Sequence, residues 1–205
     1  RIISTQQLLD NIQNIVYLNL ENTNLIQIPQ MGNLELLRCN KTPIVSIPVL
    51  PKLKILYCRE CLNLMSIASE YPQLQLLDCK NTKISILPKT KFLRSLNCSD
   101  CENINSIPYE YNNLDFLNCS GTNIISLSGF EKLKVLYCIN CKNLSSMSLE
   151  YPSLEYFDCS GTNMTFLPDT PNLQDLTCND TSIKFLKTML KLSSIECKDS
   201  ELTNI

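Results

Sequence analysis

Residues 93–108 read Leu-Arg-Ser-Leu-Asn-Cys-Ser-Asp-Cys-Glu-Asn-Ile-Asn-Ser-Ile-Pro, and this stretch contains the pattern that decides the fold. Its first six residues have the form L-x-x-L-x-C. The same form recurs along the chain, with its first residue at Leu34, Leu53, Leu74, Leu93, Leu114, Leu133, Leu154, Leu173 and Leu192; in the units that begin at Leu154 and Leu192, Phe157 and Ile195 take the place of the second leucine. A copy without the cysteine begins at Ile15, and every step between copies is 19 or 21 residues. A short period of this kind predicts an array of stacked structural units.

The fourth and sixth residues of each unit, such as Leu96 and Cys98, alternate with more polar neighbours. This alternation predicts a short β-strand with two side chains facing inward. One such strand does not bury its apolar face alone, so successive copies are expected to stack as a parallel sheet with strands about 4.8 Å apart. About a dozen residues per unit remain for the return path, which leaves room for turns and short 3₁₀ segments but not for a regular helix.

Two kinds of unit alternate through the middle of the array. One continues C-x-x-T-x-I, as at residues 79–84, and the other continues C-x-x-C-x-x-[LI], as at residues 98–104. Over residues 15–205 the pattern resembles the leucine-rich repeat, L-x-x-L-x-L-x-x-[N/C/T]-x-L. The threonine/cysteine alternation is similar to repeats of plant intracellular immune receptors, and the short unit to those of bacterial effectors. The cysteine at the sixth position is similar to repeat proteins of giant DNA viruses of amoebae.

The resemblance implies an α/β-type repeat solenoid with a parallel β-sheet on its concave face. Its convex face is then mostly irregular or 3₁₀, with little regular helix. We expect residues 15–205 to form the solenoid in ten units, of which the last is incomplete. Residues 1–14 are expected to form an N-terminal cap or partial repeat, because Ser4 to Leu9 contain a candidate capping box followed by apolar residues.

The last unit stops without a polar cap. Its inward positions include Leu192, Ile195, Cys197 and Leu202, which meet water unless something covers them. We therefore expect that the polypeptide continues past Ile205, or that this end self-associates or packs on another protein.

Composition excludes several classes of function. The chain of 205 residues has no histidine and four glycines, and neither GxGxxG nor GxxxxGK[ST] occurs in it. Histidine-based catalysis and phosphate-cradling loops are therefore excluded, and we expect no enzyme and no cofactor. The net charge of −2 gives no reason to expect a nucleic-acid or membrane partner, and no apolar run of about 18 residues exists.

The cysteines allow a chemical and a structural interpretation. Three C-x-x-C pairs have the spacing of half a zinc or iron–sulfur site, namely Cys58/Cys61, Cys98/Cys101 and Cys138/Cys141. The first member of each pair lies where the repeat buries a residue, and the second lies where other units have threonine. We therefore favour small buried core residues over metal ligands or disulfides. Stacked thiols predict an intracellular location: the cytoplasm, a host cytoplasm or a virion.

Glu-Tyr pairs recur in every second unit, at Glu70-Tyr71, Glu110-Tyr111 and Glu150-Tyr151. Their place just before the next unit favours a structural role in the return turn over a functional aromatic ladder. Tyrosine buries its ring and leaves its hydroxyl in water in such an arrangement.

The third and fifth strand positions face outward, so the fold does not dictate them. An apolar and aromatic stripe with polar neighbours crosses this face, and such exposed stripes mark protein-binding sites. The predicted partner-binding residues are Tyr17, Leu36, Arg38, Ile55, Tyr57, Leu76, Asp78, Phe116, Val135, Tyr137, Tyr156 and Asp158. The alternative is that β-propensity alone selects Ile, Val, Phe and Tyr there. Charge is uneven along the face, positive in units two to five and negative in units six to ten.

These observations favour a non-catalytic protein–protein interaction module that binds a protein on the concave face. Two alternatives remain. The chain is a structural or self-assembling protein, such as a virion component, or it is the recognition part of a larger enzyme or immune receptor.

Overall fold

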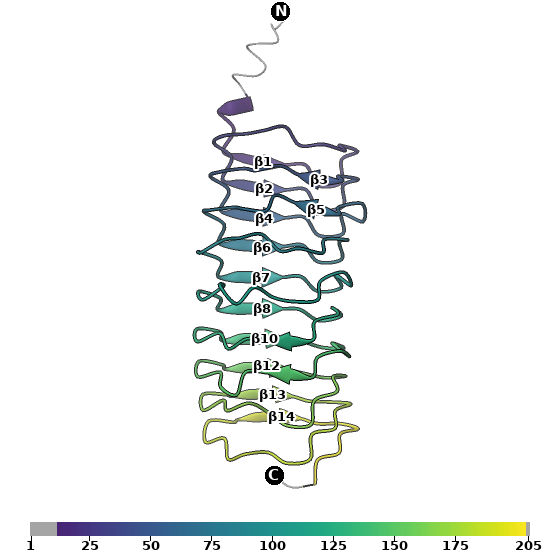
Figure 1. The fold of residues 1–205 in the computed structure, drawn as a ribbon, viewed down its shortest axis with the longest axis vertical. Helices are drawn as coiled ribbons and strands as arrows, with labels where there is room; N and C mark the ends of the chain where they lie inside the picture. Colours follow the sequence, from purple (N-terminus) through teal and green to yellow (C-terminus); the bar gives the residue numbers. More distant parts are fainter. Residues whose placement is uncertain (1–11, 204–205) are drawn as a thin grey trace, which may run out of the picture.

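The computed structural model describes residues 12–203, and they form a parallel β-solenoid (Figure 1). One ten-stranded sheet runs its whole length. Its strands, in spatial order, are β1 (Tyr17–Asn19), β2 (Leu36–Arg38), β4 (Ile55–Tyr57), β6 (Leu76–Asp78), β7 (Ser95–Asn97), β8 (Phe116–Asn118), β10 (Val135–Tyr137), β12 (Tyr156–Asp158), β13 (Asp175–Thr177) and β14 (Ser194–Glu196). The predicted fold class is confirmed.

All strands of this sheet are parallel and in register. Each third-position residue lies beside the third-position residue of the next coil, as Phe116 lies beside Val135. The fifth positions pair in the same way, as Tyr137 does with Asp158. The side chains of one repeat position therefore form a continuous column along the sheet.

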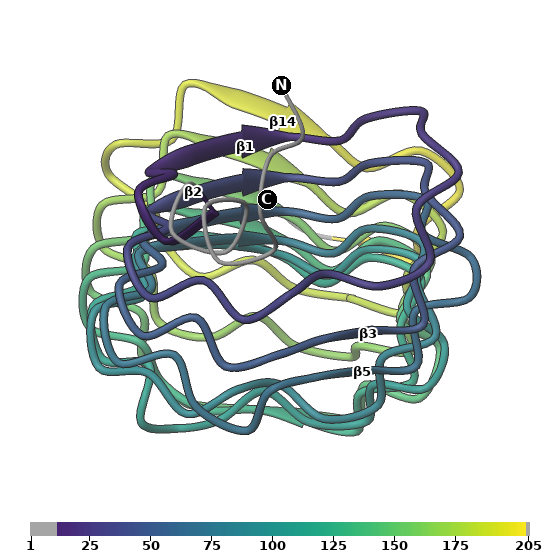
Figure 2. The same cartoon turned by 90° about the horizontal axis from the view of Figure 1, so that it is seen from above.

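The opposite side of the solenoid consists of extended segments, turns and two small parallel sheets. One pairs β3 (Ser46–Ile47) with β5 (Ser66–Ile67), and the other pairs β9 (Ser126–Leu127) with β11 (Ser146–Met147). Figure 2 shows the coils from above, with the strands of the large sheet on one side and the connecting segments, which include β3 and β5, on the other. Within residues 12–203, helix is confined to residues 12–13, and none there is long and apolar enough to cross a bilayer. The candidate capping box at Ser4 to Leu9 lies outside the described residues.

The core fills the space between the two sides. The fourth and sixth repeat positions are buried in every coil but the first and the last, for example at Leu56, Cys58, Leu96 and Cys98. Isoleucines and leucines of the return path, such as Ile84, complete each layer. This confirms the predicted strand phase. In the last coil, the inward residues predicted to meet water pack against the core but remain partly exposed. They are Leu192, Ile195, Cys197 and Leu202.

A residue with left-handed backbone conformation follows each of the ten strands of the large sheet. Positive φ occurs at Asn22, Lys41, Glu60, Asn81, Asp100, Gly121, Asn140, Gly161, Asp180 and Asp199. Most are Asn, Asp or Gly, the residue types that tolerate this conformation best. The turn directs the amide N–H of Asp100 to the carbonyl of Ser120, at 2.8 Å, and the same bond recurs in neighbouring coils. It thereby extends the hydrogen-bond ladder beyond the strands.

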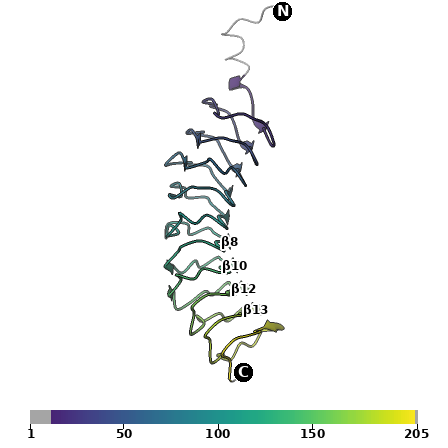
Figure 3. The same cartoon turned by 90° about the vertical axis from the view of Figure 1, so that its right-hand side faces the viewer.

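The solenoid is bowed, with the large sheet on the inner side of the curve (Figure 3). The side chains at the third and fifth positions of each repeat therefore form the concave face. This is the face that the sequence predicts for partner binding.

Candidate partner-binding site

All twelve residues predicted to bind a partner lie on the concave sheet, in seven of its ten strands. Most of them are half-buried between neighbouring coils. Tyr17, on the edge strand β1, is the most exposed of them, with 54% of its surface accessible. Ser95 and Asn97 of β7 separate an aliphatic group on β2 to β6 from an aromatic group on β8 to β12.

The aromatic group, called the aromatic cluster below, consists of Phe116, Tyr137 and Tyr156. The ring centroids of Phe116 and Tyr137 are 6.0 Å apart, and those of Tyr137 and Tyr156 are 5.0 Å apart. The rings are tilted by 53° and 42°, which is a favourable arrangement for aromatic pairs. Burial, together with the neighbouring Tyr137 and Asp158, raises the pKa of Tyr156 above its usual value.

A different arrangement occupies the N-terminal half of the concave face. The guanidinium carbon of Arg38 lies 4.5 Å from the centre of the Tyr57 ring. Arg59 donates to Asp78 Oδ2 from Nε at 2.6 Å, and its Nη2 lies 2.5 Å from the same oxygen. This bond, more than any other interaction, raises the pKa of Arg59. Cations of the chain itself therefore cover the tyrosine and the carboxylate here.

The side chains of Asp78 and Asp158, the two aspartates of the predicted site, are less exposed than expected for residues on a solvent-facing side of the sheet. Asp78 is 4% exposed and Asp158 is 9% exposed. Each carboxylate turns back to accept the amide N–H two residues later, at 3.4 Å from Lys80 and 3.0 Å from Ser160. The neighbouring coils, about 4.8 Å away on either side, then cover the short side chain.

Ion pairs link adjacent coils along the edge where the chain enters the strands. They are Lys54–Glu35 at 2.8 Å, Arg94–Asp115 at 2.6 Å and Lys134–Glu155 at 2.9 Å. These residues are not among the predicted site residues, although the two partners of each pair lie one repeat period apart in the sequence.

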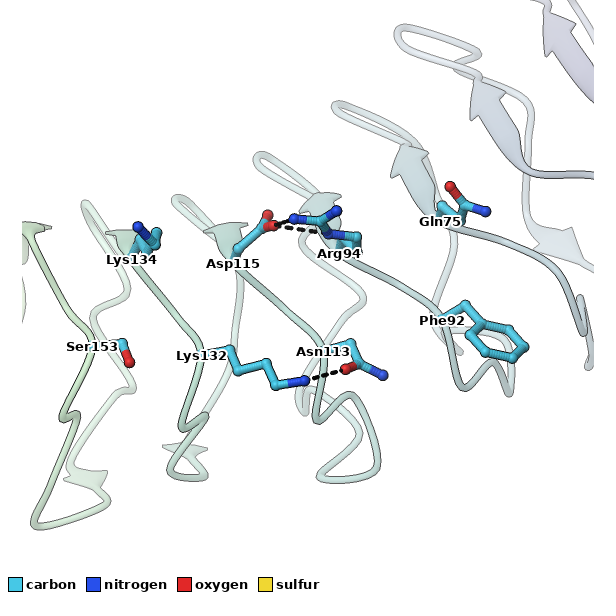
Figure 4. A pocket seen from close by; sticks show the side chains of 8 residues that line it. All are labelled: Gln75, Phe92, Arg94, Asn113, Asp115, Lys132, Lys134 and Ser153. Atoms are coloured by element: carbon cyan, nitrogen blue, oxygen red, sulfur yellow. Dashed lines mark hydrogen bonds and ion pairs between the residues drawn. The ribbon is translucent and has the colours of Figure 1, made fainter.

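The same edge is hollowed beside Phe92, with a volume of about 760 Å³. Figure 4 shows Arg94 directed at Asp115 and Lys132 directed at Asn113 across the hollow. Lys134 pairs with Glu155. Two of the three cationic groups of the hollow, Arg94 and Lys134, are thus paired with carboxylates, and Lys132 bonds to an amide oxygen. The hollow is therefore a poorer candidate for an acidic ligand than its lysines suggest.

The second cysteine of each C-x-x-C pair takes part in a hydrogen-bonded ladder. Cys61 Sγ donates to the carbonyl of Cys39 at 2.9 Å and lies 3.3 Å from Thr42 Oγ1. Thr42 Oγ1 itself donates to the Cys39 carbonyl at 2.7 Å. Cys101 and Cys141 repeat this geometry in later coils. The interpretation of the second cysteine as a replacement for threonine is confirmed by these shared bonds.

All twelve cysteines are free, and eleven of them are buried. Among residues 12–203, no three Cys, Asp or Glu side chains are grouped so as to hold a metal ion. Burial raises the pKa of the Cys58, Cys98 and Cys138 thiols well above the usual value. The reactive thiolate is therefore disfavoured at these three positions. The second cysteines differ: hydrogen bonds, first of all with the cysteine of the preceding coil, lower the pKa of Cys61 to about 6 and those of Cys101 and Cys141 to about 7, so only burial protects these thiols from reagents.

This burial predicts the chemical reactivity of the thiols. In native protein at pH 8, we expect a thiol reagent such as 5,5′-dithiobis(2-nitrobenzoate) to modify Cys197 quickly and the core thiols only when the protein unfolds. All twelve should react in guanidinium chloride. The absorbance of the released thiolate measures how many thiols react in native protein and how many react in unfolded protein. Rapid reaction of several thiols in native protein would contradict the buried ladder, and stoichiometric zinc or iron in protein purified without chelator would contradict the structural interpretation.

The recurring tyrosines Tyr71, Tyr111 and Tyr151 are fully buried in the return path. Their predicted structural role is consistent with this position, but the expectation that their hydroxyls stay in water is wrong. Tyr111 donates to the carbonyl of Pro88 at 2.6 Å, and Tyr71 donates to that of Pro48 at 3.0 Å. Burial raises the pKa of each of the three phenols. The preceding coil supplies a backbone carbonyl that accepts from each buried hydroxyl.

A parallel sheet on the concave side, one strand per coil and irregular return segments define the leucine-rich-repeat solenoid. Cysteines at the sixth position of nine consecutive coils add a ladder to it. The functional domain of InlJ from Listeria monocytogenes, which includes a cysteine ladder, has a similar structure, with a TM-score of 0.65 and 21% identity. The match covers 94% of this chain and 55% of that one, so the chain spans about half the length of the InlJ domain.

Two further solved structures have the same fold. YopM from Yersinia enterocolitica WA-314 has a TM-score of 0.57 and 15% identity, covering 100% of this chain and 70% of that one. The internalin inlF from Listeria monocytogenes str. 4b F2365 has a TM-score of 0.58 and 17% identity, covering 96% and 64%. No protein-family model matches the chain. No curated protein matches it in sequence.

Proposed function

We propose that this chain is a non-catalytic module that binds a protein partner on its concave face, with the aromatic cluster at the centre of contact. The observation that carries the proposal is the cluster itself. Phe116, Tyr137 and Tyr156 stand side by side on the solvent side of the sheet, while the hydrophobic core lies on the other side.

The chemistry of these residues supports the proposal. Tyrosine and phenylalanine are enriched at protein interfaces, because they bury a large area and lose little side-chain entropy. The strands that carry them are tied to both neighbouring coils by parallel pairing. A partner would therefore meet a surface that is already ordered, which lowers the entropic cost of association. We further propose an intracellular location, which the ladder of free thiols supports.

A structural, self-assembling role is the second candidate. It is favoured by the last coil, where Leu192, Ile195 and Leu202 remain partly exposed. Contact between two such ends would bury these side chains. The molecular mass in solution as a function of concentration distinguishes this role from a monomeric binding module.

Affinity capture with two matched variants tests the binding module. Tyr137→Ser removes the central ring of the aromatic cluster, whereas Tyr109→Ser removes a tyrosine that is 71% exposed and lies outside the large sheet. We expect a protein from the source cell to be retained by wild type and by Tyr109→Ser, and to be lost with Tyr137→Ser. Thermal unfolding of each variant checks that both remain folded. Equal retention by both variants would contradict binding through the concave face.

A further inference from the structure

The concave face contains the same tyrosine–aspartate pair twice. Tyr57 on β4 lies in register beside Asp78 on β6, and Tyr137 on β10 lies in register beside Asp158 on β12. The second pair follows the first by four coils, which is two full rounds of the alternating units, so the two pairs occupy equivalent places in the solenoid. The chain therefore supplies its own comparison between two copies of one arrangement.

In the first copy, the carboxylate and the ring are both occupied by arginine. Arg59 bonds to Asp78 Oδ2 through Nε and approaches it through Nη2, while the Arg38 guanidinium lies over the Tyr57 ring. Guanidinium suits this environment because it is planar, weakly hydrated and able to stack on aromatic rings. The first copy shows that this geometry accommodates such a group.

In the second copy, the two arginines are replaced by neutral residues. Ile139 stands where the first copy has Arg59, and Asn118 stands where it has Arg38. Asp158 is nevertheless only 9% exposed, and its Oδ1 accepts the amide N–H and the hydroxyl of Ser160, at 3.0 and 2.7 Å. Within residues 12–203, Oδ2 of Asp158 has no hydrogen-bond or ion-pair partner. Oδ2 is not shut off from solvent as Thr170 Oγ1 is, so it stays accessible to a cation that approaches the concave face, and a charged hydrogen bond to it would be strong.

We infer that Asp158, Tyr137 and Tyr156 form a receptor for one arginine side chain of the partner. The inference rests on the proposed binding function and specifies its chemistry. The guanidinium of the partner bonds to Asp158 Oδ2 and stacks on the adjacent ring, as Arg59 and Arg38 do in the first copy. The negative charge of units six to ten attracts a basic segment to this end of the face. Lysine fits less well, because its ammonium makes no planar contact with a ring.

Binding of a single side chain tests the receptor without the partner. The probe is N-acetylarginine amide, added to protein with isotope-labelled tyrosine rings and followed by nuclear magnetic resonance. We expect saturable shifts of the Tyr137 and Tyr156 ring signals. N-acetylcitrulline amide, which has nearly the same shape but no charge, should leave them in place. Equal shifts with both probes would overturn the inference.

Two substitutions separate the receptor from general attraction to an acidic surface. Asp158→Asn keeps the shape of the side chain and should weaken binding of the arginine probe about tenfold or more, as loss of a charged hydrogen bond implies. Ile139→Arg recreates the first copy, so the new side chain should occupy Asp158 and abolish the response to the probe. Asp180→Asn, which removes an exposed carboxylate from the turn after β13, should leave the affinity within about twofold, as a solvent-screened charge implies. Unchanged binding by Asp158→Asn or by Ile139→Arg would overturn the inference.

Failure of the receptor and failure of the binding module have different signatures. If the arginine probe does not bind while Tyr137→Ser still loses the captured protein, only the arginine receptor is wrong. If the probe binds as described while the captured protein ignores Tyr137→Ser, the proposed function is wrong and the receptor stands.

Discussion

Replacing Tyr111 with alanine is expected to lower the free energy of unfolding by about 3–5 kcal/mol, the usual cost of truncating a large buried aromatic residue. The side chain is 1% exposed and spans the return path of its coil. Its removal leaves a cavity and deprives the Pro88 carbonyl of the hydroxyl that donates to it at 2.6 Å. Urea unfolding followed by circular dichroism measures the change.

Two controls divide this loss into its parts. Tyr111→Phe keeps the ring and removes only the hydroxyl, so a loss of about 1–2 kcal/mol is expected from the unsatisfied carbonyl. Tyr109→Ala changes a tyrosine two residues away that is 71% exposed, and should alter stability by no more than about 0.5 kcal/mol. Similar losses for Tyr109→Ala and Tyr111→Ala would contradict the buried position of Tyr111.

Two threonines in equivalent places are expected to respond to the same substitution with opposite signs. Thr90 and Thr170 are both buried and lie four coils apart, at the position where the intervening coils have Tyr111, Phe130 and Tyr151. Thr90 Oγ1 donates to the Leu74 carbonyl at 3.0 Å. Thr170 Oγ1 is buried and has no hydrogen-bond partner among the described residues.

Valine has nearly the shape of threonine without the hydroxyl. Thr170→Val should therefore raise the free energy of unfolding by about 1–2 kcal/mol, because it removes a buried polar group that nothing satisfies. Thr90→Val should lower it by about 1 kcal/mol through loss of the bond to Leu74. The same denaturation measurement compares the two variants. Destabilisation of both to the same degree would show that the Thr170 hydroxyl does have a partner in solution.

The repeat alone was enough to predict the parallel sheet and the phase of its strands. Leu96 and Cys98 point into the core, and a shift of the strand by one residue would turn both side chains to the solvent. Burial of these residues therefore determines which side chains of the strand face inward. The short convex strands were not predicted. β3 and β5 contain two residues each, which is too few for an alternating pattern to identify.

Features that join different coils were harder to predict. The Tyr111 hydroxyl reaches a carbonyl 23 residues earlier, and only the path of the return segment brings the two together. Asp78 was assigned to an open column, but the turn to its own amide and the guanidinium of Arg59 enclose it. The signal was present, since Arg59 precedes Asp78 by one repeat period. Opposite charges one repeat period apart on the same face predict such a pair.

The predicted binding residues lie on one face because the register of the sheet places them there. Which of them contact a partner stays a prediction. The division of that face is a finding of the structure: Arg38 and Arg59 cover the tyrosine–aspartate pair of the first half, and nothing in the described chain covers the pair of the second half in this way.

The hydrogen bonds between successive coils also determine how the molecule responds to force. The bonds of the sheet join strands of successive coils, so they lie along the long axis of the solenoid. Tension between the two ends of the chain loads one row of bonds at a time, as in opening a zipper, instead of shearing many rows together. Extension then proceeds coil by coil at low force, and each step releases one repeat of chain, about 70 Å when fully extended.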